Sequence, residues 1–360
     1  MSGVENRAKI LAINPGSTST KFAIYEGHEA VFEDTLRHPS VDIAKFAKVV
    51  DQLDWRMELI VEGLKSHNVE IADLDAVVGR GGLVKPIKGG VYEVNGALYH
   101  DSKEAEHEHA SNLGALIAKG IADKIGVKAY IADPVVVDEL DDVARISGHP
   151  AFPRTSAFHA LNSKAIAKRH AKSVGKRYED MNLIVAHMGG GISVSVHKKG
   201  RVVDTTNALS GAGSFSPERA GRVEPLTLVE VCFSGKYTQE EISKMLIGKG
   251  GLVAHLGYNS MYDAVCAAND GDAKAKSVVD AFCYNVAKDV GAMSTVLCGE
   301  VDAILITGGI AFSEFIVKWI TERVQWISEV VPYPGEDELG ALVSGVIDVM
   351  EGETEVQTYI

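Results

Sequence analysis

Short apolar runs recur along the chain, and glycine-rich or polar turns separate them. Residues 10–13 are apolar, the turn NPGSTST follows, and residues 22–25 are apolar again, which predicts two strands joined by a tight loop. Similar runs predict strands at 76–79, 128–132, 182–186, 192–197, 201–204, 301–306 and from Val330. Helical spacing predicts helices at 43–67, 103–125, 156–173 and 273–297. Three further helices are expected: one that a capping box opens at Thr238 and Glu241, one from Ser313, and one near the C-terminal end. This alternation of strands and helices is typical of an α/β fold.

One pattern occurs twice in the chain. ILAINPGSTSTKFAIYEG and LIVAHMGGGISVSVHKKG both run apolar strand, polar residue, glycine-rich turn and second strand, and each is followed by a third strand that ends in Asp-Thr. The repeat predicts two α/β domains related by duplication, with chance similarity of two glycine turns as the alternative. The alignment pairs Asn14 with His187, Gly16 with Gly189, Gly27 with Gly200 and Asp34-Thr35 with Asp204-Thr205.

The composition narrows the class of function. The 36 basic and 49 acidic residues give a formal charge of −13, which argues against a nucleic-acid or anionic-membrane partner. The four cysteines form no zinc-ligand pattern, the first ten residues lack the apolar core of a secretory signal, and no apolar run reaches the length of a membrane span. We therefore expect a cytoplasmic protein. Glycine makes up 36 of 360 residues beside only 10 prolines, which indicates tight turns rather than disorder.

The two glycine-rich turns carry groups that bind phosphate. NPGSTSTK offers glycine amides, hydroxyls, the Asn14 amide and the Lys21 cation, and HMGGG offers amides and an imidazole. Neither is a Walker A sequence, and a strand rather than a helix follows each, which excludes the dinucleotide-binding fingerprint. An ordinary hairpin turn is the alternative for each, but their matching places in the two halves favour a ligand.

Several motifs follow the order found in one known family. INPGSTSTK, GRGG, ADP, FPRTSAFHALNSKAIAKRHA, VAHMGGGISVSVHKKGRVVDTTNALSG and ITGGIAFSE make residues 8–356 similar to the acetokinase family, and in particular to its butyrate branch. The resemblance implies two ribonuclease-H-like domains, as in actin-like ATPases, with a nucleotide cleft between them. The first domain is expected to take residues 1–150 with the terminal segment 336–360, and the nucleotide-binding domain residues 151–335.

The implied activity is reversible phosphoryl transfer, ATP + butyrate = ADP + butyryl phosphate, with Mg²⁺. The resemblance also suggests a homo-oligomer, a dimer or larger. Acetate, propionate or branched short-chain acids are the alternative substrates. A non-catalytic, actin-like nucleotide-binding protein is the alternative from another class.

The resemblance implies which residues bind nucleotide and metal. The family's loop N-x-G-S-S-S-x-K, which contacts nucleotide phosphates and the magnesium environment, matches Asn14, Gly16, Ser17, Thr18, Ser19 and Lys21. Further nucleotide contacts are implied for Gly189, Gly190 and Gly191, and, in the adenosine loop, for Gly308, Gly309 and Ile310. Magnesium is expected near Asn14, Asp133 and one of Glu336, Asp337 and Glu338, of which we favour Glu338.

A second set matches the family's catalytic groups: Arg80, Asp133, His159, His187 and Arg219. In phosphoryl transfer the protein supplies positioning and positive charge. Two arginines can clamp the carboxylate and the migrating phosphoryl group, two histidines can donate hydrogen bonds as charge spreads, and carboxylates can hold hydrated magnesium. Arg222 replaces an acidic residue of the family's motif, which leaves the contacts around Arg219 open.

Each of these assignments has an ordinary alternative. Asp133 before a proline is typical of a turn, His159 of a helix start and Arg80 of a surface ion pair. His107 and His109 resemble a metal pair, but two positions apart on the expected helix they face different sides, so a solvated helix face is favoured.

Two glycines bear on the length of the acyl chain. Gly81 and Gly82 follow Arg80 where acetate kinases have a bulkier, valine-containing motif. We therefore expect a roomier pocket that accepts a four-carbon or branched acid.

Overall fold

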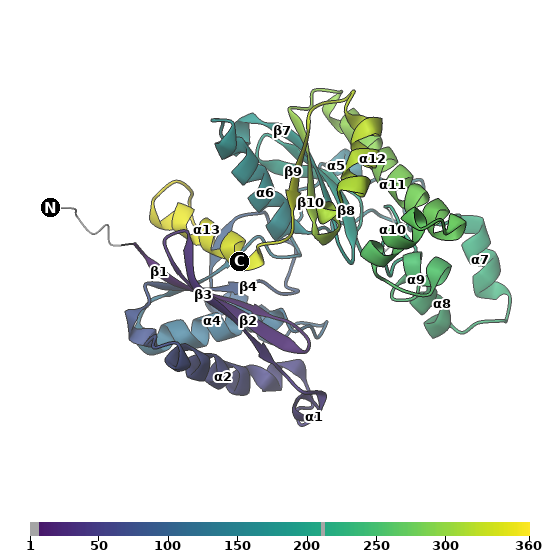
Figure 1. Cartoon of the computed structure of the whole chain (residues 1–360). Coiled ribbons are helices and arrows are strands. Elements are labelled where there is room, and N and C mark those ends of the chain that lie inside the picture. The colour runs from purple at the N-terminus through teal and green to yellow at the C-terminus, as the bar shows by residue number, and fades with distance from the viewer. Residues whose placement is uncertain (1–6, 210–212) are drawn as a thin grey trace. The chain divides into compact units, whose positions relative to one another are not determined.

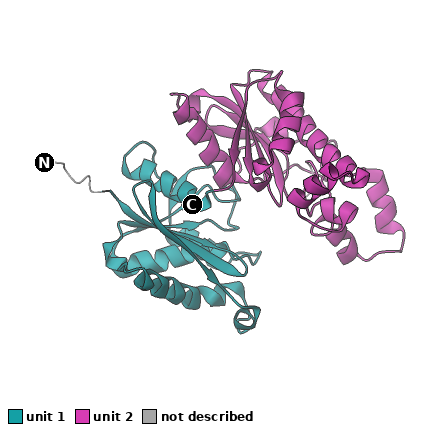
Figure 2. Ribbon diagram, in the orientation of Figure 1, with its two compact units in different colours: residues 1–137, 337–360 teal, residues 138–336 magenta. Residues whose placement is uncertain are grey.

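A computed structural model describes residues 7–209 and 213–360, so the start of the leader and residues 210–212, where the NALSG motif ends, lie outside the described part. The chain divides into two compact units, Met1–Val137 with Asp337–Ile360, and Asp138–Glu336 (Figure 2). Unit 1 thus combines the beginning of the chain with its last segment. Residues 138–150, which we had expected in the first domain, belong to unit 2.

Unit 1 is a mixed sheet with helices packed on it (Figure 1). Its strands are β1 (Lys9–Pro15), β2 (Ser19–Glu26), β3 (Glu29–Arg37), β4 (Ala76–Arg80), β5 (Val91–Glu93) and β6 (Lys128–Ala132). Its helices are α1 (Ser40–Ile43), α2 (Leu53–Ser66), α3 (Gly96–Lys103), α4 (Asn112–Ile125) and α13 (Glu338–Met350), with 3-10 turns at Val49–Gln52 and Ile71–Asp73. The strand order is β3-β2-β1-β4-β6-β5; the first three strands form an antiparallel meander, and β4 and β6 continue parallel to β1.

Unit 2 repeats this plan. Its strands are β7 (Asn182–Met188), β8 (Ile192–Lys198), β9 (Arg201–Thr205), β10 (Ala303–Gly308) and β11 (Val330–Pro334). Its helices are α5 (Asp142–Arg145), α6 (Ala160–Ser173), α7 (Pro225–Phe233), α8 (Gln239–Leu246), α9 (Gly251–Leu256), α10 (Met261–Asn269), α11 (Ala273–Ser294) and α12 (Glu314–Val324), with 3-10 turns at Tyr178–Asp180, Thr295–Leu297 and Gly309–Phe312. The order β9-β8-β7-β10-β11 matches β3-β2-β1-β4-β6 in unit 1, with two parallel strands beside an antiparallel meander.

The match between the units extends to single residues. The second turn of each meander needs a left-handed residue, and Gly27 (φ 60°) and Gly200 (φ 86°) supply it without steric cost. In the third strand the Thr35 amide donates to Asp34 Oδ1 at 2.6 Å, and the Thr205 amide donates to Asp204 Oδ1 at 2.7 Å. The duplicated α/β architecture expected from the sequence is confirmed.

Close backbone packing fixes the strand that ends at Arg80. A Cβ atom at Gly79 would lie 2.1 Å from the carbonyl oxygen of Gly114 in α4, so the helix backbone rests directly on β4. Leu113, Leu116 and other apolar residues of α4 are buried in the core cluster of unit 1. This packing holds the carboxyl end of β4 rigidly.

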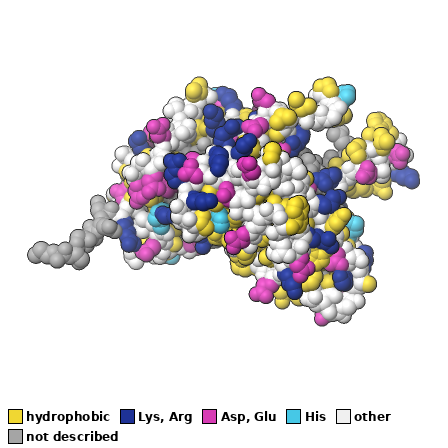
Figure 3. Space-filling view, turned by 90° about the horizontal axis from the view of Figure 1, so that it is seen from above, with side chains coloured by type: hydrophobic (Ala, Val, Ile, Leu, Met, Phe, Trp, Pro, Cys, Tyr) yellow, Lys and Arg dark blue, Asp and Glu magenta, His cyan; other side chains and the backbone are white. Residues whose placement is uncertain are grey.

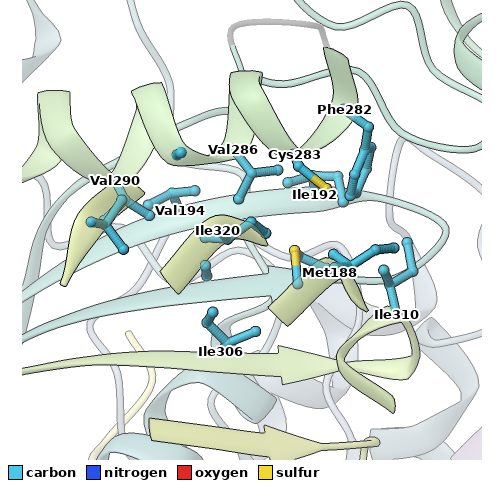
Figure 4. Close-up of a cluster of buried hydrophobic side chains, with 14 of the residues drawn as sticks. Met188, Ile192, Val194, Phe282, Cys283, Val286, Val290, Ile306, Ile310 and Ile320 are labelled. Carbon is cyan, nitrogen blue, oxygen red and sulfur yellow. The ribbon is translucent and has the colours of Figure 1, made fainter. Parts of the chain in front are cut away.

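The core of unit 2 anchors the glycine-rich turn on both sides. Met188 ends β7 and Ile192 begins β8, and both side chains are buried in the core cluster that also contains Phe282, Cys283 and Val286 of α11 (Figure 4). The residues between them therefore form a short loop with two fixed ends.

One expected helix begins later than its apolar spacing predicted. The sequence suggested a helix over 43–67, but α2 begins at Leu53. Before it, the Lys48 amide donates to Asp51 Oδ2 at 2.9 Å and closes a 3-10 turn. The local carboxylate competes there with helical hydrogen bonding.

The helix expected over 103–125 begins only at Asn112, because α3 ends at Lys103 and a loop separates it from α4. Its break has a tertiary cause in Asn112, whose Oδ1 accepts from the Leu83 amide at 2.7 Å and whose Nδ2 donates to the His107 carbonyl at 3.0 Å. The side chain of a residue at the start of α4 thus ties two loops together and holds the intervening residues out of the helix.

Candidate active site

The carboxyl ends of three parallel strands in unit 1 carry three of the expected site residues. Ile13 of β1 is in register with Gly79 of β4, so Asn14 and Arg80 lie side by side one residue further on. Arg80 is in register with Ala132 of β6, and Asp133 follows directly. In open α/β sheets ligands bind at this edge of the sheet.

One carboxylate connects Asn14 and Arg80. Asn14 Nδ2 donates to Glu338 Oε2, and Arg80 Nη1 donates to Glu338 Oε1, each at 2.5 Å. Glu338 is the first residue of α13, so the last helix of the chain completes this group. Arg80 does form an ion pair, which was the alternative interpretation of this residue. The pair with Glu338 is partly buried, however, and forms a three-residue cluster with Asn14.

Asp133 adopts a backbone conformation that is rare outside glycine. Its φ is 37°, its amide donates to the Gly90 carbonyl at 3.0 Å, and its Oδ1 accepts from the Gly90 amide at 2.7 Å. A left-handed conformation before a proline costs of the order of 1 kcal/mol or more, and such residues cluster at functional sites. The turn predicted as the alternative exists, and it holds a buried carboxylate in one orientation.

The β1–β2 loop presents the expected phosphate-binding groups. Ser17 and Thr18 are exposed, and the Gly16 amide donates to the Ser19 carbonyl at 2.7 Å to close the turn. Lys21 is exposed and stands directly opposite Asn14 in the β1–β2 register, so both side chains lie on the same face of the sheet. The hydroxyl groups of the loop and the Lys21 ammonium group thereby lie at the same end of β1 as Asn14.

The three consecutive acidic residues have three different partners. Glu336 ends unit 2 and its Oε1 lies 3.1 Å from His187 Nε2. Asp337 accepts from the Gly340 amide at 2.8 Å and caps α13. Glu338, the residue favoured from the sequence, is the one that lies beside Asn14.

Two histidines of unit 2 form a stacked pair. The ring centroids of His159 and His187 are 3.7 Å apart and the ring planes are 10° from parallel. His159 Nδ1 lies 2.9 Å from the Ser193 hydroxyl oxygen, which fixes the ring. His159 precedes α6 but its side chain does not cap that helix. His187 was expected in the glycine loop, but it is part of β7, since the strand continues to Met188.

Arg219 lies across the glycine-rich turn. A Cβ atom at Gly191 would lie 2.1 Å from Arg219 Nη1 and 3.3 Å from His159 Cε1, so the missing side chain makes room for the guanidinium group. Arg219 Nη1 donates to the Ala208 carbonyl at 2.6 Å, and the Ser216 hydroxyl donates to the Gly190 carbonyl at 2.7 Å. Burial lowers the pKa of Arg219 from its usual value. Loop, arginine and histidine are thus one packed group.

The sequence left the surroundings of Arg219 open, and the structure fills them with an ion pair. Arg222 Nη2 donates to Asp289 Oδ1 at 2.6 Å. The other oxygen, Asp289 Oδ2, accepts from the Ser214 amide at 2.8 Å and from its hydroxyl at 2.7 Å. Asp289 is buried in α11 and therefore ties the segment that carries Arg219 to the core. A single acidic residue within a helical pattern gives no sign of this role.

The expected adenosine loop follows β10. Gly308 has a φ of 90°, and a Cβ there would lie 2.3 Å from the Met188 carbonyl oxygen, so this glycine is required for the close approach of two strand ends. Gly309 is exposed and begins a 3-10 turn in which Ile310 is buried. Because Thr307 is in register with His187, this turn and the histidine pair lie at the same edge of the sheet.

The space at Gly81 and Gly82 is filled. A Cβ at Gly81 would lie 2.6 Å from Pro134 Cβ, and one at Gly82 would lie 2.3 Å from Asn112 Oδ1. These glycines therefore permit close packing of neighbouring segments, and the roomier acyl pocket stays a prediction.

His107 and His109 lie in the loop between α3 and α4, which corrects their placement on a helix. Both are exposed, and His109 Nδ1 is 2.7 Å from the Ser111 hydroxyl oxygen. Within residues 7–209 and 213–360, no group of three or more His, Cys, Asp or Glu side chains is arranged to hold a metal ion.

Two properties of the whole described part are its surface charge and the hydropathy of its helices. In the view of Figure 3, Lys and Arg side chains are interspersed with Asp and Glu side chains. None of the described helices is both long enough and apolar enough to cross a membrane.

Comparison with known proteins identifies the family. The chain is 51% identical to butyrate kinase 2 of Clostridium acetobutylicum over 352 residues, which cover 98% of this chain and 99% of that protein. The model of the acetokinase family matches residues 152–327. The chain belongs to the acetokinase family. A probable butyrate kinase of Clostridium botulinum is 50% identical to this acetokinase, also over 352 residues, with coverage of 98% and 99%.

Solved structures of acetate and propionate kinases share the fold of this chain. The crystal structure of Porphyromonas gingivalis acetate kinase superposes with a TM-score of 0.77 at 18% identity, covering 95% of this chain and all of the other. A propionate kinase from Francisella tularensis gives a TM-score of 0.73 at 18% identity, with coverage of 94% and 98%. The resemblance to this family that the motifs implied is confirmed.

Proposed function

We propose that this acetokinase is a butyrate kinase that catalyses ATP + butyrate = ADP + butyryl phosphate. The observation that carries the proposal is 51% identity to a butyrate kinase over 98% of the chain. The geometry supports it, because both sheets present cationic and hydrogen-bonding side chains at the carboxyl ends of their parallel strands. These groups suit two small anions, a nucleotide and a carboxylate.

In unit 1, Arg80 binds the carboxylate substrate and Asn14, with the loop that follows it, binds phosphate oxygens. Glu338 orients Arg80 through its 2.5 Å contact. A guanidinium group remains charged and offers paired donors, which fits a planar carboxylate. Lys21 adds a cation on the same face of the sheet as Asn14.

In unit 2, Arg219, His159 and His187 stabilise the phosphoryl group as it moves, and Gly189, Gly190 and Gly191 let phosphate approach the backbone. In phosphoryl transfer the negative charge spreads over three oxygens, and fixed donors lower the barrier. The stacked rings and the bond to Ser193 hold the histidines in one orientation. The carboxylate of butyrate attacks phosphorus directly, so the reaction needs no protein nucleophile. Gly308, Gly309 and Ile310 take the adenosine.

The residues present fit Mg²⁺ that arrives with the nucleotide. Magnesium prefers one or two carboxylates together with phosphate oxygens and water. Glu338 supplies a carboxylate beside the amide of Asn14, and Asp133 supplies a second, buried one at the same edge of the sheet. When bound, the ion would neutralise charge on the phosphates. The residues proposed to hold it are Asn14, Asp133 and Glu338.

Trapping acyl phosphate as its hydroxamate, with ATP, magnesium and a series of acids, tests the proposed function. We expect the highest kcat/KM for butyrate or isobutyrate. A higher kcat/KM for acetate than for both would make the protein an acetate kinase. Absence of product with every short-chain acid, despite nucleotide binding, would support the non-catalytic alternative.

We also propose a homo-oligomer, a dimer or larger, that works in the cytoplasm. Helix α7 supports the first part, because no residue of PLTLVEVCF is buried, and Leu226, Val229 and Phe233 are all exposed. Apolar helices of this kind are normally covered. Sedimentation analysis of the protein and of Phe233→Asp tests the oligomer; a monomeric wild type would refute it.

A further inference from the structure

A buried arginine lies beneath the β1–β2 loop. Arg56 comes from α2, and only 1% of its surface is exposed. Within the described residues, its hydrogen-bond acceptors are all uncharged oxygens, and no carboxylate pairs with it. A buried cation without an anionic partner is costly, and burial lowers the pKa of Arg56 to about 10. A buried cation at such a cost points to a function at this place.

The guanidinium group of Arg56 binds mainly the backbone carbonyl groups of the β1–β2 loop. Nη1 donates to the carbonyl oxygens of Gly16 at 2.7 Å and Ser19 at 3.4 Å, and Nη2 donates to that of Ser17 at 3.3 Å. Nη1 also lies 3.2 Å from the Thr20 hydroxyl oxygen. One side chain therefore contacts three carbonyl groups of the Gly16–Ser19 loop and the hydroxyl group of Thr20 in β2.

The same carbonyl groups determine where the loop's donors point. The remaining carbonyl, that of Thr18, accepts from the His38 amide at 2.8 Å, so all four carbonyls from Gly16 to Ser19 are engaged within unit 1. In contrast, no acceptor for the amides of Ser17 and Thr18 occurs among the residues that the structure describes. Successive amides whose carbonyls are turned inward form an anion-binding concavity.

Two neighbours fix Arg56 itself. Gln52 Oε1 accepts from Arg56 Nε at 3.0 Å and from Nη2 at 2.8 Å, which sets the plane of the guanidinium group. On the other side, Thr20 Oγ1 is 2.8 Å from His38 Nε2. The guanidinium charge is thus held rigidly behind the loop. From there Arg56 attracts an anion bound by the loop without contacting that anion.

We propose that Arg56 is a positioning residue for the nucleotide: it turns the carbonyls of the Gly16–Ser19 loop inward, so that the loop's amides face the phosphates. This rests on the proposed kinase function, in which that loop binds ATP. Arg56 itself does not touch the substrate, and its effect passes through the loop.

The test compares Arg56→Met and Arg56→Lys with Lys65→Met, which removes a cation from an exposed position of the same helix. The measurements are KM for ATP, KM for butyrate, kcat, and the dissociation constant of ADP with magnesium by calorimetry. We expect Arg56→Met to raise KM for ATP and the ADP dissociation constant about tenfold. The reason is that the loop loses the hydrogen bonds that order its backbone. KM for butyrate should stay within about twofold, because Arg80 is untouched.

Arg56→Lys should restore part of the affinity, since an ammonium group keeps the charge but cannot span the same carbonyls. Lys65→Met should match the wild type. If Arg56→Met does not fold, Gln52→Leu frees the guanidinium group without removing it and should raise KM for ATP severalfold. Unchanged ADP affinity in the folded Arg56 variants, or an equal rise in both KM values, would overturn the proposal. A wild type that binds ADP but phosphorylates no acid would refute the kinase function alone.

Discussion

The imidazole rings of His159 and His187 lie face to face, with centroids 3.7 Å apart, although the two residues are 28 positions apart in the chain. Each ring has its own polar contact: the Ser193 hydroxyl for His159, and the Glu336 carboxylate for His187. Stacking and these polar contacts together restrain the orientation of both rings. A transition state with spreading negative charge benefits most from donors that need no reorganisation.

Removing the His187 ring should therefore impair catalysis. His187→Ala is expected to lower kcat at least about tenfold, the effect of losing one positioned donor. His28→Ala, which removes an exposed histidine from the β2–β3 turn, serves as the control. Steady-state kinetics with far-UV circular dichroism checks both. Near-normal turnover in His187→Ala and in Arg219→Ala would contradict the assignment of the site.

A single methyl group at Gly191 should displace Arg219. The added Cβ would lie 2.1 Å from Arg219 Nη1, well inside contact distance. We expect Gly191→Ala to lower kcat about tenfold or more, since a displacement of about 1 Å at a catalytic group has effects of this size. Gly148→Ala, where the methyl group meets no atom within 4 Å, should behave as wild type. Equal kinetics for the two variants would show that Arg219 is not held in this way.

Replacing Asp289 should lower both the free energy of unfolding and the turnover. Asp289→Ala leaves the Ser214 donors and Arg222 without their shared acceptor, which we expect to cost about 3 kcal/mol of unfolding free energy. Turnover should fall in the fraction that remains folded, because the segment that carries Arg219 loses its anchor. Urea unfolding and kinetics measure the two effects. Glu322→Ala, at an exposed site of α12, should change neither.

Neutralising the acidic residues one at a time should separate their roles. Glu338→Gln is expected to raise the magnesium concentration for half-maximal rate severalfold, because it removes the carboxylate beside Asn14. Asp337→Ala should leave that concentration unchanged but cost about 1 kcal/mol of stability through the lost cap. Glu336→Gln should affect kcat through His187. A magnesium effect confined to Glu336→Gln would exclude Glu338 as a ligand.

Acid should destabilise the protein partly through His38. Burial, and next the charge of Arg56, lower the pKa of His38 to about 4 from 6.5. The folded state therefore binds fewer protons than the unfolded state between these values, so stability is complete above pH 6.5 and falls as pH drops toward 4. The contribution is up to about 1.4 kcal/mol per pH unit. His38→Gln should show a shallower loss of unfolding free energy from pH 6.5 to 4.5; a slope equal to that of wild type would contradict the assignment.

The fold was largely predictable because its signals are local. The meanders appear as apolar runs, and their turns as Gly27 and Gly200, whose left-handed conformation only glycine adopts without cost. The helix over 103–125 failed for a non-local reason: Asn112 is bound to Leu83, 29 residues away. A spacing rule cannot include such a contact.

The same division applies to the candidate site. Residues at strand ends, such as Asn14 and Arg80, stand out because polar groups follow apolar runs. Arg56 and Asp289 do not, since each looks like the exposed face of a helix until its partners are known. Their partners are backbone groups and a distant loop, and neither leaves a motif.

The contact between Glu338 and Arg80 joins residues 258 positions apart, and this has a consequence for synthesis. Residues 337–360 leave the ribosome after the whole of unit 2, yet α13 packs on β1, β4 and β6 of unit 1. Domains tend to fold as they emerge, the N-terminal one first. The part of unit 1 that is made first therefore waits for residues 337–360 before the group of Asn14, Arg80 and Glu338 at its sheet edge is complete. A nascent chain therefore lacks the contacts of Glu338 with Asn14 and Arg80 until residues 337–360 have been made.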